Sequence, residues 1–147
     1  MKKFDSEQVM NGTWGELWID DEYMAEVKKF RAEINASYED VKRTRHLMVG
    51  KKLTSLAGEG EVGLYRVSSF LSKKIADSLK EGRTPVFKII GKLDDPNSIG
   101  AERVVLYNCK FEKSTLADWE SGSLAEESYS FTFEDWDNLD AALPNEE

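Results

Sequence analysis

The chain has 147 residues, a formal net charge of −8 and one cysteine. This length favours one domain with its own core, and a single thiol excludes a disulfide within the chain. The N-terminus lacks the apolar stretch of a signal peptide, and no apolar run reaches the roughly 18 residues of a membrane-spanning helix. We therefore expect a single domain, 1–147, folded in the cytoplasm, with no membrane anchor.

The charges are unevenly placed along the chain. Ten of the 28 acidic residues follow Lys113, and no Lys or Arg does. Residues 42–52 (KRTRHLMVGKK) hold five Lys or Arg and one His without any acid. A solvated face and a solvated tail are the simplest interpretation of the two regions. Opposite charges on separate parts of one chain also suit a head-to-tail contact between copies, which is the alternative.

The first elements expected are an N-terminal arm, 1–11, and a strand over 13–19. Trp14 and Trp18 lie on the same side of this strand, which predicts a core position for both. The alternative is a subunit interface, where Trp is enriched.

The next stretch predicts one very long strand followed by a basic loop. Apolar residues at every second position from Phe30 to Tyr38 alternate with polar ones, which is the period of a strand with one buried face. The phase slips at Lys28 and Lys29, so we expect a β-bulge there. Residues 39–58 are predicted to form an extended loop, and the chain returns as a strand over 58–68. A hairpin of this length should overhang a body of this size.

The second half predicts one helix and further strands. Ser68 and Ser69 are candidate N-caps of a helix to about Glu81, with Gly82 after its end. Its expected apolar face consists of Phe70, Leu71, Ile75, Ala76 and Leu79. Strands are expected over 84–93, 102–111 and 129–133. Cys109 should be a buried, inert thiol in register with Val105, Tyr107 and Phe111.

An acidic C-terminal segment, 134–147, ends the chain. Trp136, Leu139 and Leu143 are spaced as on one or two helical turns. Consecutive strands without intervening helices favour an antiparallel β-sandwich or β-barrel, mainly β with one flanking α-helix and a protruding hairpin.

No residue constellation in the chain indicates catalysis. The sequence from Gly58 to Gly63 matches GxGxxG, but a strand follows where the dinucleotide fingerprint needs a helix. One His and one Cys give a transition metal little to bind to, and the acidic residues lack EF-hand spacing. We therefore expect no catalytic, cofactor-binding or metal-binding residues, and no enzyme.

A contact between copies is the function that the geometry favours. Charge would set its register, and apolar residues would supply most of its affinity. The residues expected in this contact are Lys42, Arg43, Arg45, His46, Leu47, Met48, Lys51 and Lys52 on one side, and Asp135, Trp136, Asp137 and Asp140 on the other.

The sequence resembles the tail tube (tail core) proteins of contractile phage tails, in the group of PBSX-like prophages and R-type bacteriocins. The resemblance rests on residues 11–18 (NGTWGELW), on the basic residues of 42–52, on 58–65 and on the strand 129–133 leading to Trp136. It implies a structural protein whose copies form hexameric rings, with inner strands joined into one channel-lining barrel. The rings stack into a tube within a contractile sheath.

The resemblance also implies partners. These are other copies of the chain, the tail sheath, the tape-measure protein and baseplate hub proteins, with DNA only as passing cargo. The extended loop would reach the adjacent ring, and the assembled protein would be part of a phage tail or tail-like particle.

A second interpretation remains open from the residues alone. A monomeric β-barrel could bind a small apolar ligand in its interior, as small barrels do. That interpretation accounts for the aromatic residues but not for the basic loop or the separation of charge.

Overall fold

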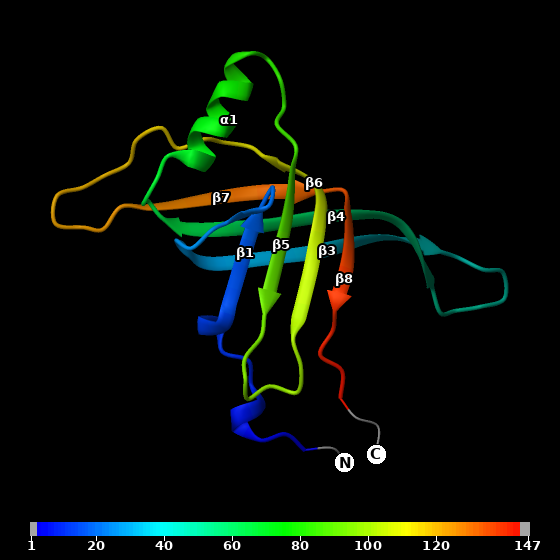
Figure 1. Cartoon of the computed structure of the whole chain (residues 1–147). Coiled ribbons are helices and arrows are strands. Elements are labelled where there is room, and N and C mark those ends of the chain that lie inside the picture. Colours follow the sequence, from blue (N-terminus) through cyan, green and yellow to red (C-terminus); the bar gives the residue numbers. More distant parts are fainter. Residues whose placement is uncertain (1–2, 145–147) are drawn as a thin grey trace.

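The computed structural model describes residues 3–144 and consists mainly of antiparallel strands (Figure 1). In chain order its elements are 3-10 helices at Ser6–Gln8 and Gly12–Trp14, then β1 (Gly15–Ile19), β2 (Glu22–Tyr23), β3 (Val27–Val41), β4 (Gly50–Tyr65), α1 (Phe70–Lys80), β5 (Phe87–Leu93), β6 (Glu102–Phe111), β7 (Glu126–Phe133) and β8 (Asp135–Asp140). The predicted strands and helix are present, although several of their bounds differ.

The strands form one sheet that folds into two layers. The order is β2-β1-β5-β6-β7-β4-β3, and β8 pairs with β6 beside this path. β6 belongs to both layers, because its first part pairs with β5 and β8 while Lys110 and Phe111 at its end pair with β7. The layers lie across each other (Figure 1), and β2 and β3 at the ends of the path do not pair. The fold is therefore an open, sandwich-like sheet and not a closed barrel.

The space between the layers is filled by large apolar side chains. Phe111 stands at its centre, with its ring edge-on to those of Phe87 and Tyr129 and tilted against that of Phe131. The buried cluster comprises Leu17, Ile19, Met24, Val62, Leu64, Leu71, Ile75, Phe87, Ile89, Leu106, Cys109, Phe111, Tyr129, Phe131 and Phe133. A core of this size stabilises the body without a disulfide.

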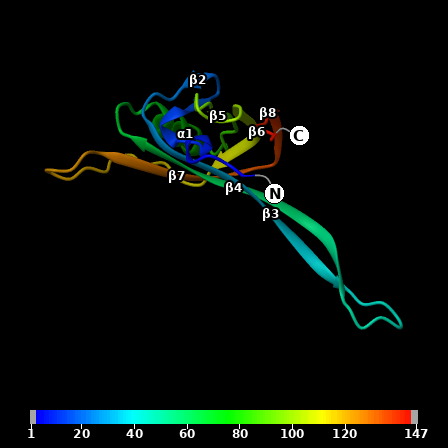
Figure 2. The same ribbon diagram turned by 90° about the horizontal axis from the view of Figure 1, so that it is seen from below.

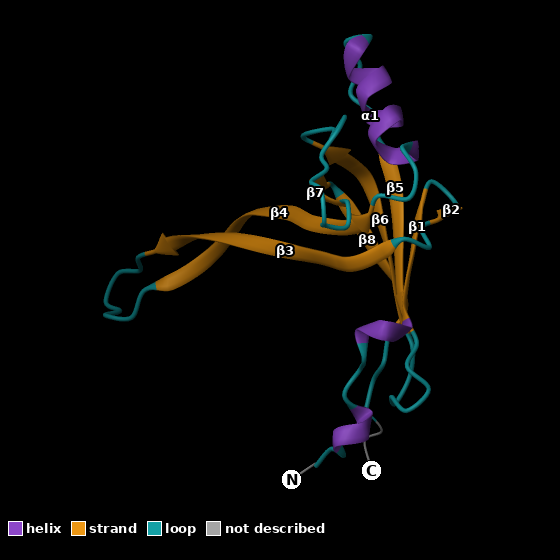
Figure 3. Cartoon of the chain, turned by 90° about the vertical axis from the view of Figure 1, so that its left-hand side faces the viewer, coloured by secondary structure: helices purple, strands orange, loops and turns teal. Residues whose placement is uncertain are grey.

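Helix α1 lies at one end of the sandwich, as Figure 3 shows in purple. Leu71 and Ile75 are buried as predicted, whereas Leu79 and Phe70 are exposed. The helix therefore docks through a narrower face than its sequence suggested. Gly82, with φ of 75°, adopts the left-handed conformation after the helix end, where glycine carries no steric cost.

Two local predictions about burial and secondary structure are wrong. Trp14 is half-exposed at the end of a 3-10 turn, and Trp18 packs only partly buried against Tyr23, because the opposite side of β1 faces the core. The expected helical turns around Trp136 and Leu139 are strand β8 instead. Over only six residues, the spacing of apolar side chains does not distinguish a helix from a strand, and pairing with β6 makes this segment a strand.

Strand β6 also differs from the predicted alternation. Asn108 has φ of 54°, and the register with β5 shifts between Phe87 and Ile89. This irregularity changes which side chains point inward, so Leu106 is buried together with Cys109, while Tyr107 is only partly buried.

Candidate assembly surfaces

The β3–β4 hairpin extends far beyond the body (Figure 2). Its strands pair from Val27 opposite Leu64 to Val41 opposite Gly50, with register shifts at Val27/Lys29 and at Ser37/Tyr38. The first shift is the predicted bulge. Strand β7 flanks β4 only as far as Gly58, so the rest of the hairpin is a two-stranded ribbon. The predicted extended loop, 39–58, is thus mostly strand, and only residues 42–49 connect the two strands.

One face of the hairpin continues the core. The cross-strand pairs Phe30 with Val62 and Ala32 with Gly60 contact the body, and a Cβ on Gly60 would lie 2.4 Å from the Phe131 ring. The same face continues outward along the ribbon, where its larger side chains are exposed. We call these the apolar row: Ile34, Tyr38, Leu53 and Leu56.

The opposite face of the sheet formed by β3, β4 and β7 is mainly polar, although Ala57 and Tyr65 also lie on it. We call it the polar face, and its polar members are Lys28, Lys29, Arg31, Glu33, Asn35, Glu59, Glu61, Glu126, Ser128, Ser130 and Thr132.

Each basic side chain of the polar face lies beside a carboxylate of the same face. Arg31 lies 2.7 Å from Glu33, Lys29 lies 3.6 Å from Glu61, and Lys28 lies 2.8 Å from Glu126. The Ser128 hydroxyl donates to Glu61, and together with Lys29 it lowers the pKa of that carboxyl. Every basic residue of this face therefore has an acidic partner.

The hairpin end carries the predicted basic residues. Four of them, Lys42, Arg43, Arg45 and His46, lie in the exposed connection between β3 and β4, together with the predicted apolar contact residues Leu47 and Met48. Lys51 and Lys52 instead begin β4, where Lys51 forms an ion pair with Asp40 and Lys52 lies opposite Glu39. Their charges are thus partly compensated within the chain.

The predicted acidic residues lie on β8, at the side of the body. Asp140 is 3.2 Å from Arg103, and Asp137 accepts a hydrogen bond of 3.2 Å from the Tyr107 hydroxyl. Desolvation raises the pKa of Tyr107, and the hydrogen bond to Asp137 raises it further. Trp136 is half-buried and packs against the core. Within one copy the hairpin end projects away from β8 (Figure 1), so the structure does not bring the two predicted groups together.

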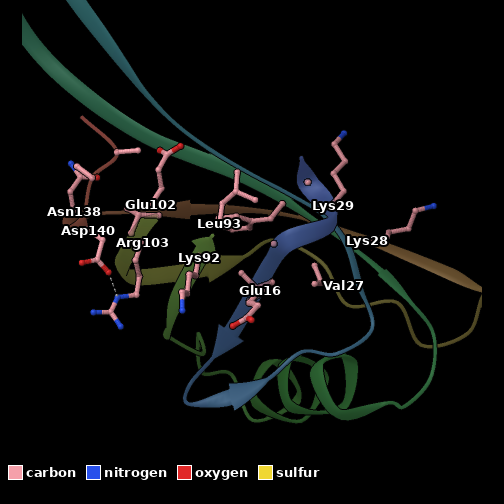
Figure 4. Close-up of a pocket in the computed structure, with 18 of the residues that line it drawn as sticks. Glu16, Val27, Lys28, Lys29, Lys92, Leu93, Glu102, Arg103, Asn138 and Asp140 are labelled. Carbon is pink, nitrogen blue, oxygen red and sulfur yellow. Dashed lines mark ion pairs between the residues drawn. The ribbon is translucent and has the colours of Figure 1, made fainter. Parts of the chain in front are cut away.

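An open groove of about 660 Å³ lies in the body beside β3 (Figure 4). Its apolar floor includes Leu17 and Leu93, and charged side chains of both signs surround it. Arg103 and Asp140 pair with each other on one side. This groove is open and charged, unlike the enclosed apolar interior that the ligand-binding alternative requires.

A surface that the sequence analysis did not predict is the loop 112–125. Three large side chains on it, Leu116, Trp119 and Leu124, are almost fully exposed. The base of the loop is fixed, because Arg66 donates to the carbonyl oxygens of Thr115 at 2.9 Å and Leu116 at 3.1 Å. The signal was present in the sequence as three large apolar residues within a link that is otherwise polar.

A buried charge holds Arg66 in place. Glu127 on β7 lies 3.4 Å from the Arg66 guanidinium and accepts a hydrogen bond from the Tyr129 hydroxyl. Burial and the neighbouring carboxylate raise the pKa of Tyr129 to about 12. This network anchors the loop to the sheet and to the start of α1, since Ser114 also bonds to the Ser72 carbonyl at 2.6 Å.

The remaining candidates for chemistry are the Cys109 thiol and groups of possible metal ligands. Cys109 is buried, and burial raises the pKa of its thiol to about 12, so it is the inert thiol that the sequence predicted. Within residues 3–144 no group of three or more His, Cys, Asp or Glu side chains could hold a metal ion. In the same range, no helix is long and apolar enough to cross a membrane.

Comparison with known proteins assigns the chain to a family. The family model described as phage tail tube protein matches residues 2–140. The phage-like element PBSX protein XkdM of Bacillus subtilis (strain 168) is 35% identical over 134 residues, covering 90% of this chain and 91% of the relative.

Solved structures share the fold at low sequence identity. A chain from the sheath/tube terminator of an extracellular contractile injection system gives a TM-score of 0.74 at 9% identity, covering 92% of this chain and all of the other. A chain from the sheath–tube complex of such a system gives a TM-score of 0.71 at 9% identity, covering 95% of this chain and all of the other.

These matches confirm the resemblance seen in the sequence, and none of them supports the ligand-binding alternative. The family consists of structural proteins and not of enzymes. The chain belongs to the phage tail tube protein family.

Proposed function

We propose that this chain builds the inner tube of a contractile phage tail or phage-tail-like particle, as stacked hexameric rings around a channel. The observation that carries the proposal is the sheet of β3, β4 and β7, which has one core face and one mainly polar face. The outer edge of β3 also has no strand partner among residues 3–144. A long unpaired edge invites another strand, and a neighbouring copy in a ring would satisfy it.

In this arrangement the polar face lines the channel. DNA and tape-measure protein must pass without binding tightly, and phosphates bind to Lys and Arg that are free to contact them. The basic residues Lys28, Lys29 and Arg31 are held by carboxylates of the same face. The lumen would therefore hold no uncompensated positive charge on these strands.

The hairpin end supplies the contact between rings. The exposed basic residues at 42–49, with Lys51 and Lys52, would meet Asp135, Trp136, Asp137 and Asp140 of a copy in the adjacent ring. The aspartates on β8 are exposed and keep acceptor capacity beyond their internal partners. Assembly would start in the bacterial cytoplasm, with the sheath, tape-measure protein and baseplate hub as the other partners.

Charge reversal tests this contact. Arg43→Glu with Arg45→Glu should weaken stacking, and Asp135→Lys with Asp137→Lys in the same chain should restore part of it. Lys51 and Asp140 are left unchanged because each has an ion-pair partner within the chain. Exposed pairs contribute only about 0.2 to 1 kcal/mol each, so a several-fold change in the critical concentration for tube formation is expected.

The matched control is Lys80→Glu with Arg83→Glu, which changes the charge equally at exposed positions around the end of α1. Negative-stain electron microscopy and sedimentation over a salt series measure the assembly. If the tip variant and the control assemble alike, or if the second reversal restores nothing, the assignment of this contact is wrong.

A further inference from the structure

Two groups of exposed apolar side chains on β3–β4 and on the loop 112–125 are uncovered by residues 3–144 of the same copy. The first is the apolar row on the hairpin, where Tyr38 is 58% exposed and Leu56 is 52% exposed. The second is the loop 112–125, where Trp119 is 81% exposed and Leu124 is 80% exposed. Large side chains grouped in this way on a protein surface usually mark an interaction site.

The two surfaces project from opposite ends of the same sheet. In Figures 1 and 2 the hairpin leaves one end of the β7–β4–β3 sheet, and the loop between β6 and β7 leaves the other end. When identical copies stack in one orientation, the leading end of each copy faces the trailing end of the next. The hairpin of one copy and the loop of the next therefore meet in a head-to-tail stack.

The charges of the two surfaces are complementary. Asp118 and Glu120 flank Trp119, and no Lys or Arg occurs after Lys113. Asp40 and Glu39 partly compensate Lys51 and Lys52 beside Leu53, so the excess positive charge of the hairpin lies in the adjoining connection, at Lys42, Arg43 and Arg45. Two copies of the loop, or two copies of the hairpin end, would instead bring like charges together, which disfavours a symmetric contact.

The loop 112–125 borders a hollow and is hydrogen-bonded at its base. A hollow of about 410 Å³ lies between it and the start of α1, lined by Val67, Leu116 and Trp119 among others. The bonds from Arg66 to the carbonyls of Thr115 and Leu116 hold the base of the loop a few residues before Trp119. A preorganised surface loses less entropy when a partner binds.

We propose that the apolar row of one copy packs against the Trp119 loop, 112–125, of a copy in the next ring. This inference rests on the proposed stacking of rings and identifies a second contact within it. The hairpin stem would lie on the Trp119 loop, while the basic connection continues beyond it towards β8. Trp119 would be the anchor of the contact, because buried Trp carries a large share of binding energy at interfaces.

Crosslinking between copies tests the proposal directly. Cys109 is buried, so an introduced cysteine is the only accessible thiol of each variant. Leu53→Cys and Trp119→Cys proteins are prepared separately, mixed in equal amounts, assembled and treated with a short bifunctional maleimide. We expect covalent dimers in the mixture and almost none in either variant alone.

The outcomes separate the inference from the proposed function. Tubes without dimers in the mixture would overturn the inference and leave the tube function standing. Dimers of Leu53→Cys alone at the level of the mixture would indicate a symmetric hairpin contact and overturn it as well. Wild-type protein that never forms rings or tubes, even with a baseplate extract as nucleus, would contradict the proposed function itself.

A second pair of cysteine positions and an alanine variant keep the proposal testable if a cysteine variant does not assemble. If Trp119→Cys does not assemble, Leu56→Cys with Asp118→Cys replaces the first pair, with the same expectations. Trp119→Ala should raise the critical concentration for tube formation at least about tenfold while the monomer melts as before. Val86→Ala, an exposed apolar position outside the contact, should change it less than about twofold. Equal effects of the two truncations would contradict the proposal.

Discussion

The inner and outer halves of the β3–β4 hairpin follow the same sequence pattern and have opposite surroundings. On the same face of β4, Val62 is fully buried and Leu56 is 52% exposed. The alternation of apolar and polar side chains continues through both halves, but β7 ends opposite Gly58. The pattern therefore reports which face is apolar, and the neighbouring strand decides whether that face is covered within the chain.

The largest expected effect is in the body beneath the inner half. Phe131→Ala removes a ring that packs against Phe30, Phe111 and Phe133, and should lower the free energy of unfolding by roughly 3 to 5 kcal/mol. Tyr38→Ala, an aromatic truncation on the same face of the outer half, should change it by less than about 0.5 kcal/mol. Urea denaturation of the monomers measures both, and similar losses would mean that the outer half is part of the monomer's core.

A pair of truncations on one strand sharpens the comparison. Val62→Ala should cost about 2 kcal/mol, since it removes two buried methyl groups and leaves a cavity. Leu56→Ala should leave monomer stability almost unchanged but raise the critical concentration for tube formation. Thermal melts and sedimentation distinguish the two effects, and an unchanged critical concentration for Leu56→Ala would show that this part of the apolar row stays uncovered in the tube.

Much of this comparison could be predicted from the sequence, because alternation is a local property. The long strand, its bulge at Lys28 and Lys29 and the buried side of β7 all follow from spacing. Leu53 and Leu56 fall within the loop predicted over 39–58, yet register with β3 makes them strand. Pairing with β6 also makes residues 135–140 a strand, and pairing with β5 goes with the register shift near Asn108. A short window of sequence contains no information about such distant partners.

The assembly surfaces were predicted less completely. The basic connection stands out by composition, whereas the base of the loop that carries Trp119 is held by Arg66, which is distant in sequence and pairs with Glu127. Glu127 lies on the buried side of β7, in phase with the apolar side chains of that strand, and its carboxylate pairs there with Arg66 and the Tyr129 hydroxyl.

A smaller effect is expected at alkaline pH, and it should concern the body only. The pKa of Cys109 rises from 9.0 to about 12 on folding, and that of Tyr129 rises from 10.0 to about 12. Between these values the unfolded chain loses protons that the folded protein keeps, so stability should fall as pH rises from about 9 to 12. Urea denaturation at pH 8 to 11 measures this slope.

The control for that prediction is Cys109→Ala, which removes one of the two groups. Its stability at pH 8 is lower because a cavity forms, but its decline between pH 9 and 10 should be shallower than that of the wild type. An identical decline would assign the effect to other groups.

The most direct test of the whole account is electron microscopy of a shortened hairpin. Replacing residues 38–54 with Asn-Gly joins Ser37 to Ser55, which already lie opposite each other, through a favoured two-residue turn. The account predicts a monomer that melts like the wild type and forms no tubes under conditions where the wild type does. Uniform tubes from the shortened chain would contradict the claim that the outer hairpin joins one ring to the next.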